Sequence, residues 1–191
     1  GKTLQALAWF SLVRLHPQTR GKPSLVVCPT SLVENWAAEA QRFTPNLRTL
    51  IINGAVRHTR WGDVNASDLV ITSYALLRRD VEQYLEYEFA VIALDEAQHI
   101  KNRSTQNAMA AKRLRSMHRL VLTGTPIENS IADMWSIMDF LMPGYLGSLK
   151  RFKSDFMEDE ETGASRLQRA VAPFMLRRVK KEVLLELPDK Q

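Results

Sequence analysis

Two adjacent carboxylates, Asp95 and Glu96, follow directly after the apolar run FAVIAL at residues 89–94. A run that is apolar throughout predicts a strand buried on both faces, and ligands of parallel sheets bind beyond the carboxyl ends of the strands. There the first carboxylate is suited to holding Mg²⁺, and the second to acting as a general base on an attacking water. The pair therefore predicts a metal-and-water site at the edge of a sheet.

Two further polar segments suit the same chemistry. Gly1, Lys2 and Thr3 open a predicted helix and match the end of the phosphate loop G-x-x-x-x-G-K-[ST], in which the lysine contacts phosphates and the threonine hydroxyl ligates Mg²⁺. The segment TGTP at residues 123–126 follows another apolar run and supplies two hydroxyls and a turn. Each segment is a weak signal alone, because GKT arises by chance and TGTP also fits an ordinary turn.

The elements that must position these segments follow from the spacing of apolar residues. A helix-period stripe over residues 4–15 predicts an opening helix, and an apolar face from Val33 to Phe43 predicts another, preceded by Ser31 and Glu34 in capping-box spacing. Five apolar runs predict strands at residues 24–28, 47–52, 68–73, 89–94 and 119–124. Such runs, separated by segments long enough for helices, indicate an α/β fold with a parallel sheet sandwiched by helices.

The last third of the chain has a different pattern. Residues 128–144 predict a helix that ends at a Pro-Gly pair, and the remainder to about residue 187 suggests further helices. We expect residues 1–127 to form the lobe that carries the site. Residues 128–191 would be a helical extension of the same lobe.

The composition indicates a soluble, intracellular protein. Hydrophobic residues make up 45% of the 191 residues and charged residues 25%, and no apolar run approaches the roughly 18 residues that span a bilayer. The single cysteine, Cys28, lies in a predicted strand, and the four histidines show no ligand spacing, so no disulfide or metal cluster is expected. Trp36 and Trp135 fall on apolar helix faces, which favours core packing over base stacking.

The net charge of +5 is unevenly distributed. Residues 158–161 read EDEE, whereas residues 166–181 contain no acidic residue. The basic residues of that stretch are Arg166, Arg169, Arg177, Arg178, Lys180 and Lys181. The stretch fits either a solvated helix face or a surface that faces phosphates.

The order of the chemical segments resembles that of the helicase superfamily-two motors, whose motifs I, II and III match GKT, DEAQ and TGTP. Five longer segments resemble the SWI/SNF-type ATPases; they are LVVCPTSLVENWAAEAQRF, DLVITSYALLRRD, LDEAQHIKN, LTGTPIEN and APFMLRRVKKEVLLELPDK. The resemblance spans nearly the whole chain, and its wording is closer to bacterial members than to nucleosome remodellers. It implies a P-loop NTPase fold, the first RecA-like lobe of a motor, with the last third leading toward a second lobe.

The resemblance also implies a role for each matching residue at the nucleotide. ATP would bind at Gly1, Lys2, Thr3 and Gln98, and Thr3 and Asp95 would hold Mg²⁺. The catalytic residues would be Lys2 on the phosphates, Asp95 on the metal and Glu96 as the base. Gln98 stands where relatives often carry histidine, and it would couple the nucleotide site to motif III.

Further matching residues are implied to act on DNA. Thr123, Gly124 and Thr125 would link hydrolysis to movement. The residues implied to face the DNA backbone are Pro29, Thr30, Ser31, Thr72, Ser73 and Tyr74. Hydroxyls and backbone amides at loop ends suit phosphate oxygens without reading bases, so sequence-independent tracking is expected.

The implied function is ATP-dependent translocation along double-stranded DNA, which remodels protein–DNA complexes without necessarily separating the strands. The partners would be double-stranded DNA, a second RecA-like lobe of the same parent chain and a nucleoprotein target such as RNA polymerase, with no membrane. The setting would be the bacterial cytoplasm near the nucleoid, or the nucleus of a eukaryote. Because the chain opens within motif I, we expect a piece of a longer protein, and the piece alone would have little ATPase activity.

Two alternatives stay open. The first is another superfamily-two motor, an RNA helicase or a restriction-type enzyme, although LTGTPIEN and FMLRR argue against it. A non-catalytic scaffold could bind DNA or a protein through residues 166–181. Intact Lys2, Thr3, Asp95 and Glu96 argue against that second alternative, because a scaffold needs no such set of polar groups.

Overall fold

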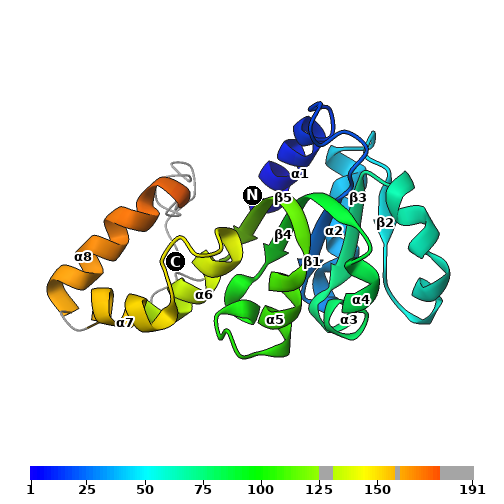
Figure 1. The fold of residues 1–191 in the computed structure, drawn as a ribbon. Coiled ribbons are helices and arrows are strands. Elements are labelled where there is room, and N and C mark those ends of the chain that lie inside the picture. Colours follow the sequence, from blue (N-terminus) through cyan, green and yellow to red (C-terminus); the bar gives the residue numbers. More distant parts are fainter. Residues whose placement is uncertain (125–130, 158–159, 177–191) are drawn as a thin grey trace, which may run out of the picture. The chain divides into compact units, whose positions relative to one another are not determined.

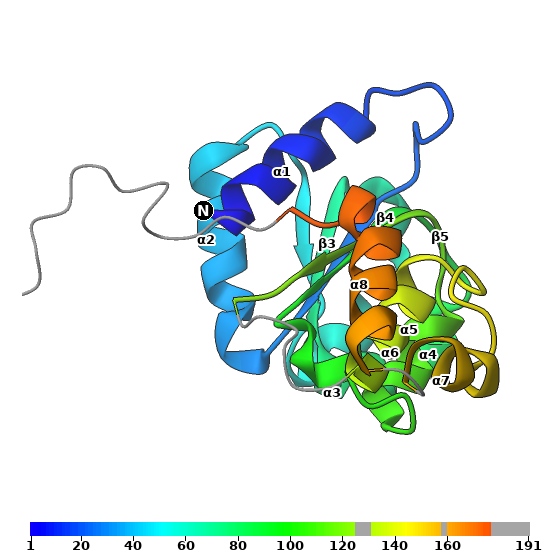
Figure 2. The same cartoon turned by 90° about the vertical axis from the view of Figure 1, so that its left-hand side faces the viewer.

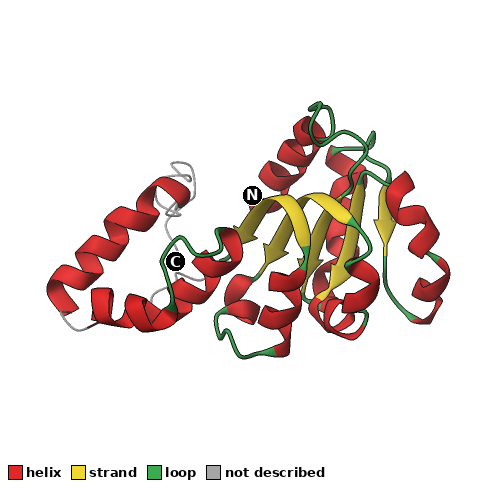
Figure 3. Ribbon diagram, in the orientation of Figure 1, coloured by secondary structure: helices red, strands yellow, loops and turns green. Residues whose placement is uncertain are grey.

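The computed structural model describes residues 1–124, 131–157 and 160–176, which fall into two compact units, residues 1–147 and 148–191. The first unit holds a five-stranded sheet with the order β2-β3-β1-β4-β5 (Figures 1 and 3). The strands are β1 (Ser24–Cys28), β2 (Thr49–Ile51), β3 (Leu69–Ser73), β4 (Glu88–Asp95) and β5 (Arg115–Leu122). Every neighbouring pair is parallel, so the predicted α/β fold is confirmed.

Helices cover both faces of this sheet (Figure 2). On one face lie α1 (Lys2–Val13) and α2 (Val33–Phe43); on the other lie α3 (Tyr74–Arg79), α4 (Val81–Tyr84), α5 (Gln106–Arg113) and α6 (Ile131–Leu141). Val26 of β1 packs with α1 and α2, whereas its neighbour Val27 packs with the opposite helices. Successive strand residues are therefore buried on opposite faces, which explains why the runs are apolar throughout.

Short 3₁₀ helices connect these elements: η1 (Thr30–Leu32), η2 (Ala55–Thr59), η3 (Trp61–Ala66) and η4 (Ala97–Ile100). The predicted capping box of Ser31 and Glu34 is wrong, because Leu32 is the N-cap of α2 and no side chain caps that helix. The N–H of Leu32 instead bonds the carbonyl of Pro29 at 2.9 Å, so a 3₁₀ turn leads straight into α2. The predictions that Trp36 and Trp135 pack in the core are confirmed.

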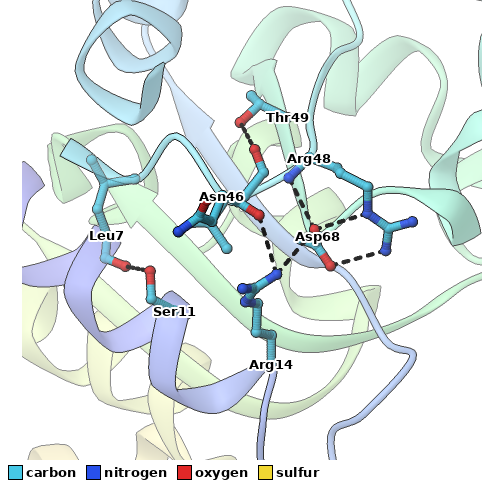
Figure 4. Close-up of polar contacts among 8 residues, drawn as sticks. Leu7, Ser11, Arg14, Asn46, Arg48, Thr49 and Asp68 are labelled. Atoms are coloured by element: carbon cyan, nitrogen blue, oxygen red, sulfur yellow. Dashed lines mark hydrogen bonds and ion pairs between the residues drawn. The ribbon is translucent and has the colours of Figure 1, made fainter. Parts of the chain in front are cut away.

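At the amino-terminal edge of the sheet, the carboxylate of Asp68 connects Arg48, just before β2, with Arg14, at the end of α1 (Figure 4). Its oxygens accept a backbone hydrogen bond from Arg48 at 2.9 Å and two guanidinium hydrogen bonds from the same residue at 3.0 and 3.1 Å. Arg14, at the end of α1, lies 3.6 Å from the same carboxylate. The Arg48 side chain is the main cause that lowers the pKa of Asp68 below its usual range.

The second unit contains α7 (Leu149–Met157), α8 (Glu160–Val171) and η5 (Ala172–Phe174). Phe152 is buried between these helices, and the guanidinium carbon of Arg166 lies 5.5 Å from the ring centre of Phe156. Arg166 and Arg169 are exposed on α8. The other basic residues predicted to line a phosphate surface lie outside the described residues; they are Arg177, Arg178, Lys180 and Lys181.

The expected boundary between a lobe and its helical extension after residue 127 stays a prediction.

In the described part of the chain, no helix combines the length and the hydropathy that crossing a membrane requires.

Candidate functional site

Asp95 ends β4 and is buried, with both carboxylate oxygens already engaged. One oxygen accepts a hydrogen bond from the indole N–H of Trp36 at 2.9 Å, and the other accepts one from the backbone N–H of Glu96, also at 2.9 Å. The hydroxyl of Tyr74 donates to the backbone carbonyl of Asp95 at 2.8 Å. These bonds fix the direction of the carboxylate. Because an ionised carboxylate has about four acceptor positions, lone pairs on its two oxygens are still free to bind a cation.

Glu96 has an unusual backbone, with φ 52° and ψ 61°. Among the described non-glycine residues it alone has a positive φ. The left-handed region is uncommon for side chains larger than glycine and is enriched at functional sites. Its half-buried side chain accepts a hydrogen bond from the amide of Gln98 at 2.9 Å, so the DEAQ segment folds back on its own glutamate.

Gly124, which follows β5, lies against the other two segments. A methyl group placed on Gly124 would lie 3.3 Å from the ammonium nitrogen of Lys2 and 4.0 Å from a carboxylate oxygen of Glu96. The lysine of GKT, the glutamate of DEAQ and the glycine of TGTP therefore meet at one place. Three segments that are far apart in the sequence are therefore close together in the structure.

The remaining nucleotide residues can be placed in less detail. Gly1 is exposed at the N-cap of α1, and Thr3 is half-buried in the first turn of that helix. Thr123 is half-buried beside Gly124, whereas Thr125 lies outside the described residues.

The donor set fits ATP and Mg²⁺. A threonine hydroxyl and a carboxylate are hard oxygen ligands of the kind Mg²⁺ prefers, and a lysine beside a helix N-terminus suits phosphates. Within the described ranges, no group of three or more His, Cys, Asp or Glu side chains could hold a metal ion.

The residues expected to face DNA divide into two groups. Thr30 and Ser31 are exposed in η1, next to half-buried Pro29. Thr72, Ser73 and Tyr74 are buried, and their side chains make contacts within the fold. The expected DNA contacts of this second group stay a prediction. Because these side chains are buried, little of their surface is available for such contacts.

Each side chain of the buried group has a defined partner. The hydroxyl of Thr72 donates to the carbonyl of Ile52 at 3.0 Å and accepts from the hydroxyl of Tyr84 at 2.8 Å. Ser73 is the N-cap of α3, and its hydroxyl accepts from a backbone N–H at 3.3 Å. Burial is the main cause that raises the pKa of Tyr74, followed by the Asp95 charge, so this phenol stays protonated at neutral pH and donates its hydrogen bond.

Sequence reasoning missed a hollow of about 500 Å³ that Thr30 and Ser73 share. Its other polar lining includes Arg57, His58 and Arg79. The guanidinium of Arg57 is held by the Asp80 carboxylate, with a shortest distance of 2.6 Å. The signal that could have found the hollow is the segment NGAVRHTR at residues 53–60, which places a glycine, two arginines and a histidine just after a strand.

Comparison with known proteins agrees with this geometry. The family model described as SNF2-related domain matches residues 1–191. A Bacillus subtilis protein named as an ATP-dependent helicase/translocase, YwqA, is 39% identical, with 100% of this chain and 22% of the relative covered. The TATA-binding protein-associated factor MOT1 of Saccharomyces cerevisiae is 37% identical, with 91% of this chain and 10% of that protein covered.

A solved structure adds the three-dimensional likeness. The SWI2/SNF2 ATPase core of Sulfolobus solfataricus, in complex with double-stranded DNA, superposes with a TM-score of 0.88 and 41% identity over 99% of this chain and 40% of that core. The predicted RecA-like lobe is thereby confirmed. This chain thus spans less than half of the length of each of these three proteins. Its sequence, its fold and the convergence of its motifs agree: the chain belongs to the family of SNF2-related domains.

Proposed function

We propose that the parent protein is an ATP-dependent translocase on double-stranded DNA, and that this chain is its first motor lobe. The observation that carries the proposal is the meeting of Lys2, Glu96 and Gly124 beside an oriented Asp95 carboxylate. Three motifs from separate parts of the chain converge where phosphoryl transfer needs a cation, a base and a metal ligand. The DNA-bound relative from Sulfolobus supports a duplex as the substrate.

Each residue at the nucleotide would have one task. Lys2 and the N-terminus of α1 hold the phosphates, while Thr3 and Asp95 hold Mg²⁺, which when bound neutralises charge on the phosphates. Glu96 takes the proton of the water whose oxygen forms the new bond to the γ-phosphorus, as the bond to the β-phosphate oxygen breaks and ADP leaves. Gln98 steadies Glu96 through its 2.9 Å hydrogen bond.

The DNA would lie along the exposed η1 segment. The DNA backbone would be faced by Pro29, Thr30 and Ser31. It would also be contacted from the end of the neighbouring strand β3 by Thr72, Ser73 and Tyr74. The hollow shared by Thr30 and Ser73 has arginine and histidine in its lining, which suits phosphate oxygens. Thr123, Gly124 and Thr125 link hydrolysis to movement.

The other parts of the function lie outside this chain. A second RecA-like lobe supplies the arginine that stabilises the transferring phosphoryl group, a contribution of about 10³ to 10⁵ in rate, so this chain alone hydrolyses ATP slowly at best. The target is a protein–DNA complex, for which RNA polymerase is one candidate. DNA as the substrate implies the bacterial cytoplasm near the nucleoid, or the nucleus in a eukaryote.

Steady-state ATP hydrolysis by the two-lobed parent tests this function. The rate is measured without nucleic acid and with single-stranded DNA, duplex DNA or RNA, beside a Lys2→Ala control. We expect stimulation by duplex DNA that disappears in the control. Stimulation by RNA or single strands alone would favour a different superfamily-two motor, and no hydrolysis under any condition would favour a scaffold.

A further inference from the structure

Two aromatic side chains hold Asp95 from outside its own strand. Trp36 is 1% exposed in α2, and Tyr74 is 3% exposed at the start of α3. The first donates to the carboxylate at 2.9 Å and the second to the backbone carbonyl at 2.8 Å. Asp95 is thus fixed at its side chain and at its main chain by two buried donors.

The bond from Trp36 acts directly on the oxygen that would meet the metal. An indole N–H can only donate, and a hydrogen bond to an ionised oxygen is shorter and stronger than one between neutral groups. Together with the backbone N–H of Glu96, it sets the rotation of the Asp95 carboxylate. Loss of partners that orient metal ligands in this way commonly lowers metal affinity about 10-fold to 100-fold.

Tyr74 belongs to one of the two segments assigned to the DNA backbone, and Trp36 lies close in sequence to the other. Trp36 lies one turn into α2, which follows directly from η1 with exposed Thr30. Tyr74 comes directly after Ser73, which lines the same hollow as Thr30. A displacement of either segment by a bound duplex would therefore move a hydrogen-bond donor of Asp95.

We propose that Trp36 and Tyr74 are positioning residues that orient the Asp95 carboxylate and transmit the binding of DNA to the metal site. The transmission rests on the proposed function, since it requires DNA at η1 and at the end of β3. The orientation of Asp95 does not, since it requires only the contacts described above. By linkage, DNA then strengthens the binding of Mg²⁺ and nucleotide by the same factor as these ligands strengthen the binding of DNA.

The test uses the two-lobed parent and two conservative variants, Trp36→Phe and Tyr74→Phe, each of which removes one donor and keeps a ring. The matched control is Trp135→Phe, because the indole of Trp135 is also buried but donates to the carbonyl of Gly147 at 3.1 Å. Binding of a fluorescent, non-hydrolysable ATP analogue is followed by anisotropy over a series of Mg²⁺ concentrations, with and without duplex DNA. Thermal unfolding of each variant is recorded beside it.

We expect Trp36→Phe to raise the Mg²⁺ concentration for half-maximal nucleotide binding about 10-fold. Tyr74→Phe should raise it less, about threefold, because the lost bond is to a neutral carbonyl. In both variants, duplex DNA should increase the affinity for nucleotide by a smaller factor than in the wild type. Nucleotide binding without Mg²⁺ should change little. Trp135→Phe should leave all of these quantities unchanged.

An unchanged Mg²⁺ requirement in a folded Trp36→Phe protein would overturn the proposal. A loss of nucleotide binding that is equal with and without Mg²⁺ would do the same, because it would indicate a general structural effect. If Trp36→Phe does not fold, an unchanged Mg²⁺ requirement in Tyr74→Phe decides against the proposal. If the wild-type parent does not bind duplex DNA, the proposed function fails, and the Mg²⁺ series without DNA still tests the orientation of Asp95.

Discussion

At the scale of a single residue, Glu96 combines a left-handed backbone conformation with a place in the candidate site. A left-handed conformation costs a residue with a Cβ about 1 kcal/mol, and here it turns the chain sharply at the end of β4. One oxygen of the Glu96 carboxylate accepts from Gln98 at 2.9 Å, and the other lies 4.0 Å from where a Cβ on Gly124 would be. If Glu96 is the base, as we propose, the hydrogen bond from Gln98 would help to hold it in this position.

Gly124 should tolerate no side chain without a loss of activity. A Gly124→Ala methyl would lie 3.3 Å from the Lys2 ammonium, which is closer than most such contacts. The ammonium must therefore shift by a few tenths of an ångström, which the flexible lysine side chain allows. A misplacement of about 1 Å can cost about 100-fold in rate, and a shift of a few tenths of an ångström costs less, so we expect ATP hydrolysis by the parent to fall about 3-fold to 10-fold with an unchanged thermal midpoint. Unchanged hydrolysis would show that the three motifs do not act together at this position.

Asp68 should give the fold a dependence on acid. Its pKa is lowered from an ordinary value of 3.8, chiefly by Arg48, so the ionised form stabilises the folded state. That contribution is fully present above the unfolded pKa and is lost as the pH falls through the lower folded pKa. Asp68→Asn should therefore be less stable than the wild type at pH 7, and the difference in unfolding free energy should shrink below about pH 4. Urea denaturation across pH checks this, and a difference that is constant from pH 7 to pH 3 would contradict it.

At the scale of elements, the strands buried on both faces were the most predictable. β1 agrees with its predicted range, and β3 and β4 agree to within a residue at each end. The prediction for β5 was less accurate: the strand starts at Arg115, four residues before the predicted start at 119, because its first half is mostly exposed and mixes polar residues with Met117. Only pairing with β4 makes that half a strand, and pairing with a distant segment leaves no periodic signal in the sequence.

The candidate site was predictable to the same extent as its elements. Glu96 and Gly124 both follow predicted strands, and the carboxyl ends of parallel strands share one edge of the sheet; the contact of Lys2 with these two residues was not predicted. The role of Trp36 was not predictable, because an indole on an apolar helix face has the pattern of any core residue. Its bond to Asp95 joins residues 59 positions apart and depends on where α2 packs on the sheet.

Thr30 and Thr72 form a matched pair that separates DNA contact from support of the fold. Thr72→Val keeps the shape but leaves the hydroxyl of Tyr84 and the carbonyl of Ile52 without this partner, at a cost of about 1 to 3 kcal/mol in unfolding free energy. Thr30→Val, in exposed η1, should leave stability unchanged and weaken duplex binding by the parent. Urea denaturation and a duplex titration check both, and the reverse assignment of the two effects would refute this division of roles.

At the scale of the whole molecule, the charge favours contact with a polyanion. The chain carries a net +5, and contacts to phosphates release counterions, so affinity should fall steeply with salt and depend little on sequence. We expect duplex binding by the parent to weaken by 10-fold or more between about 50 and 200 mM salt, for two unrelated sequences alike. Affinity that is insensitive to salt, or that differs strongly between the two sequences, would indicate base readout instead of tracking.

Movement along an intact duplex is the central claim, and displacement of a third strand measures it directly. A triplex-forming oligonucleotide is bound to one site on a duplex, and its release by the two-lobed parent is followed with ATP, without ATP and with the Lys2→Ala variant. We predict release that requires ATP and Lys2 while the two duplex strands stay paired. Separation of the duplex strands, or no release by a parent that hydrolyses ATP, would contradict translocation on double-stranded DNA.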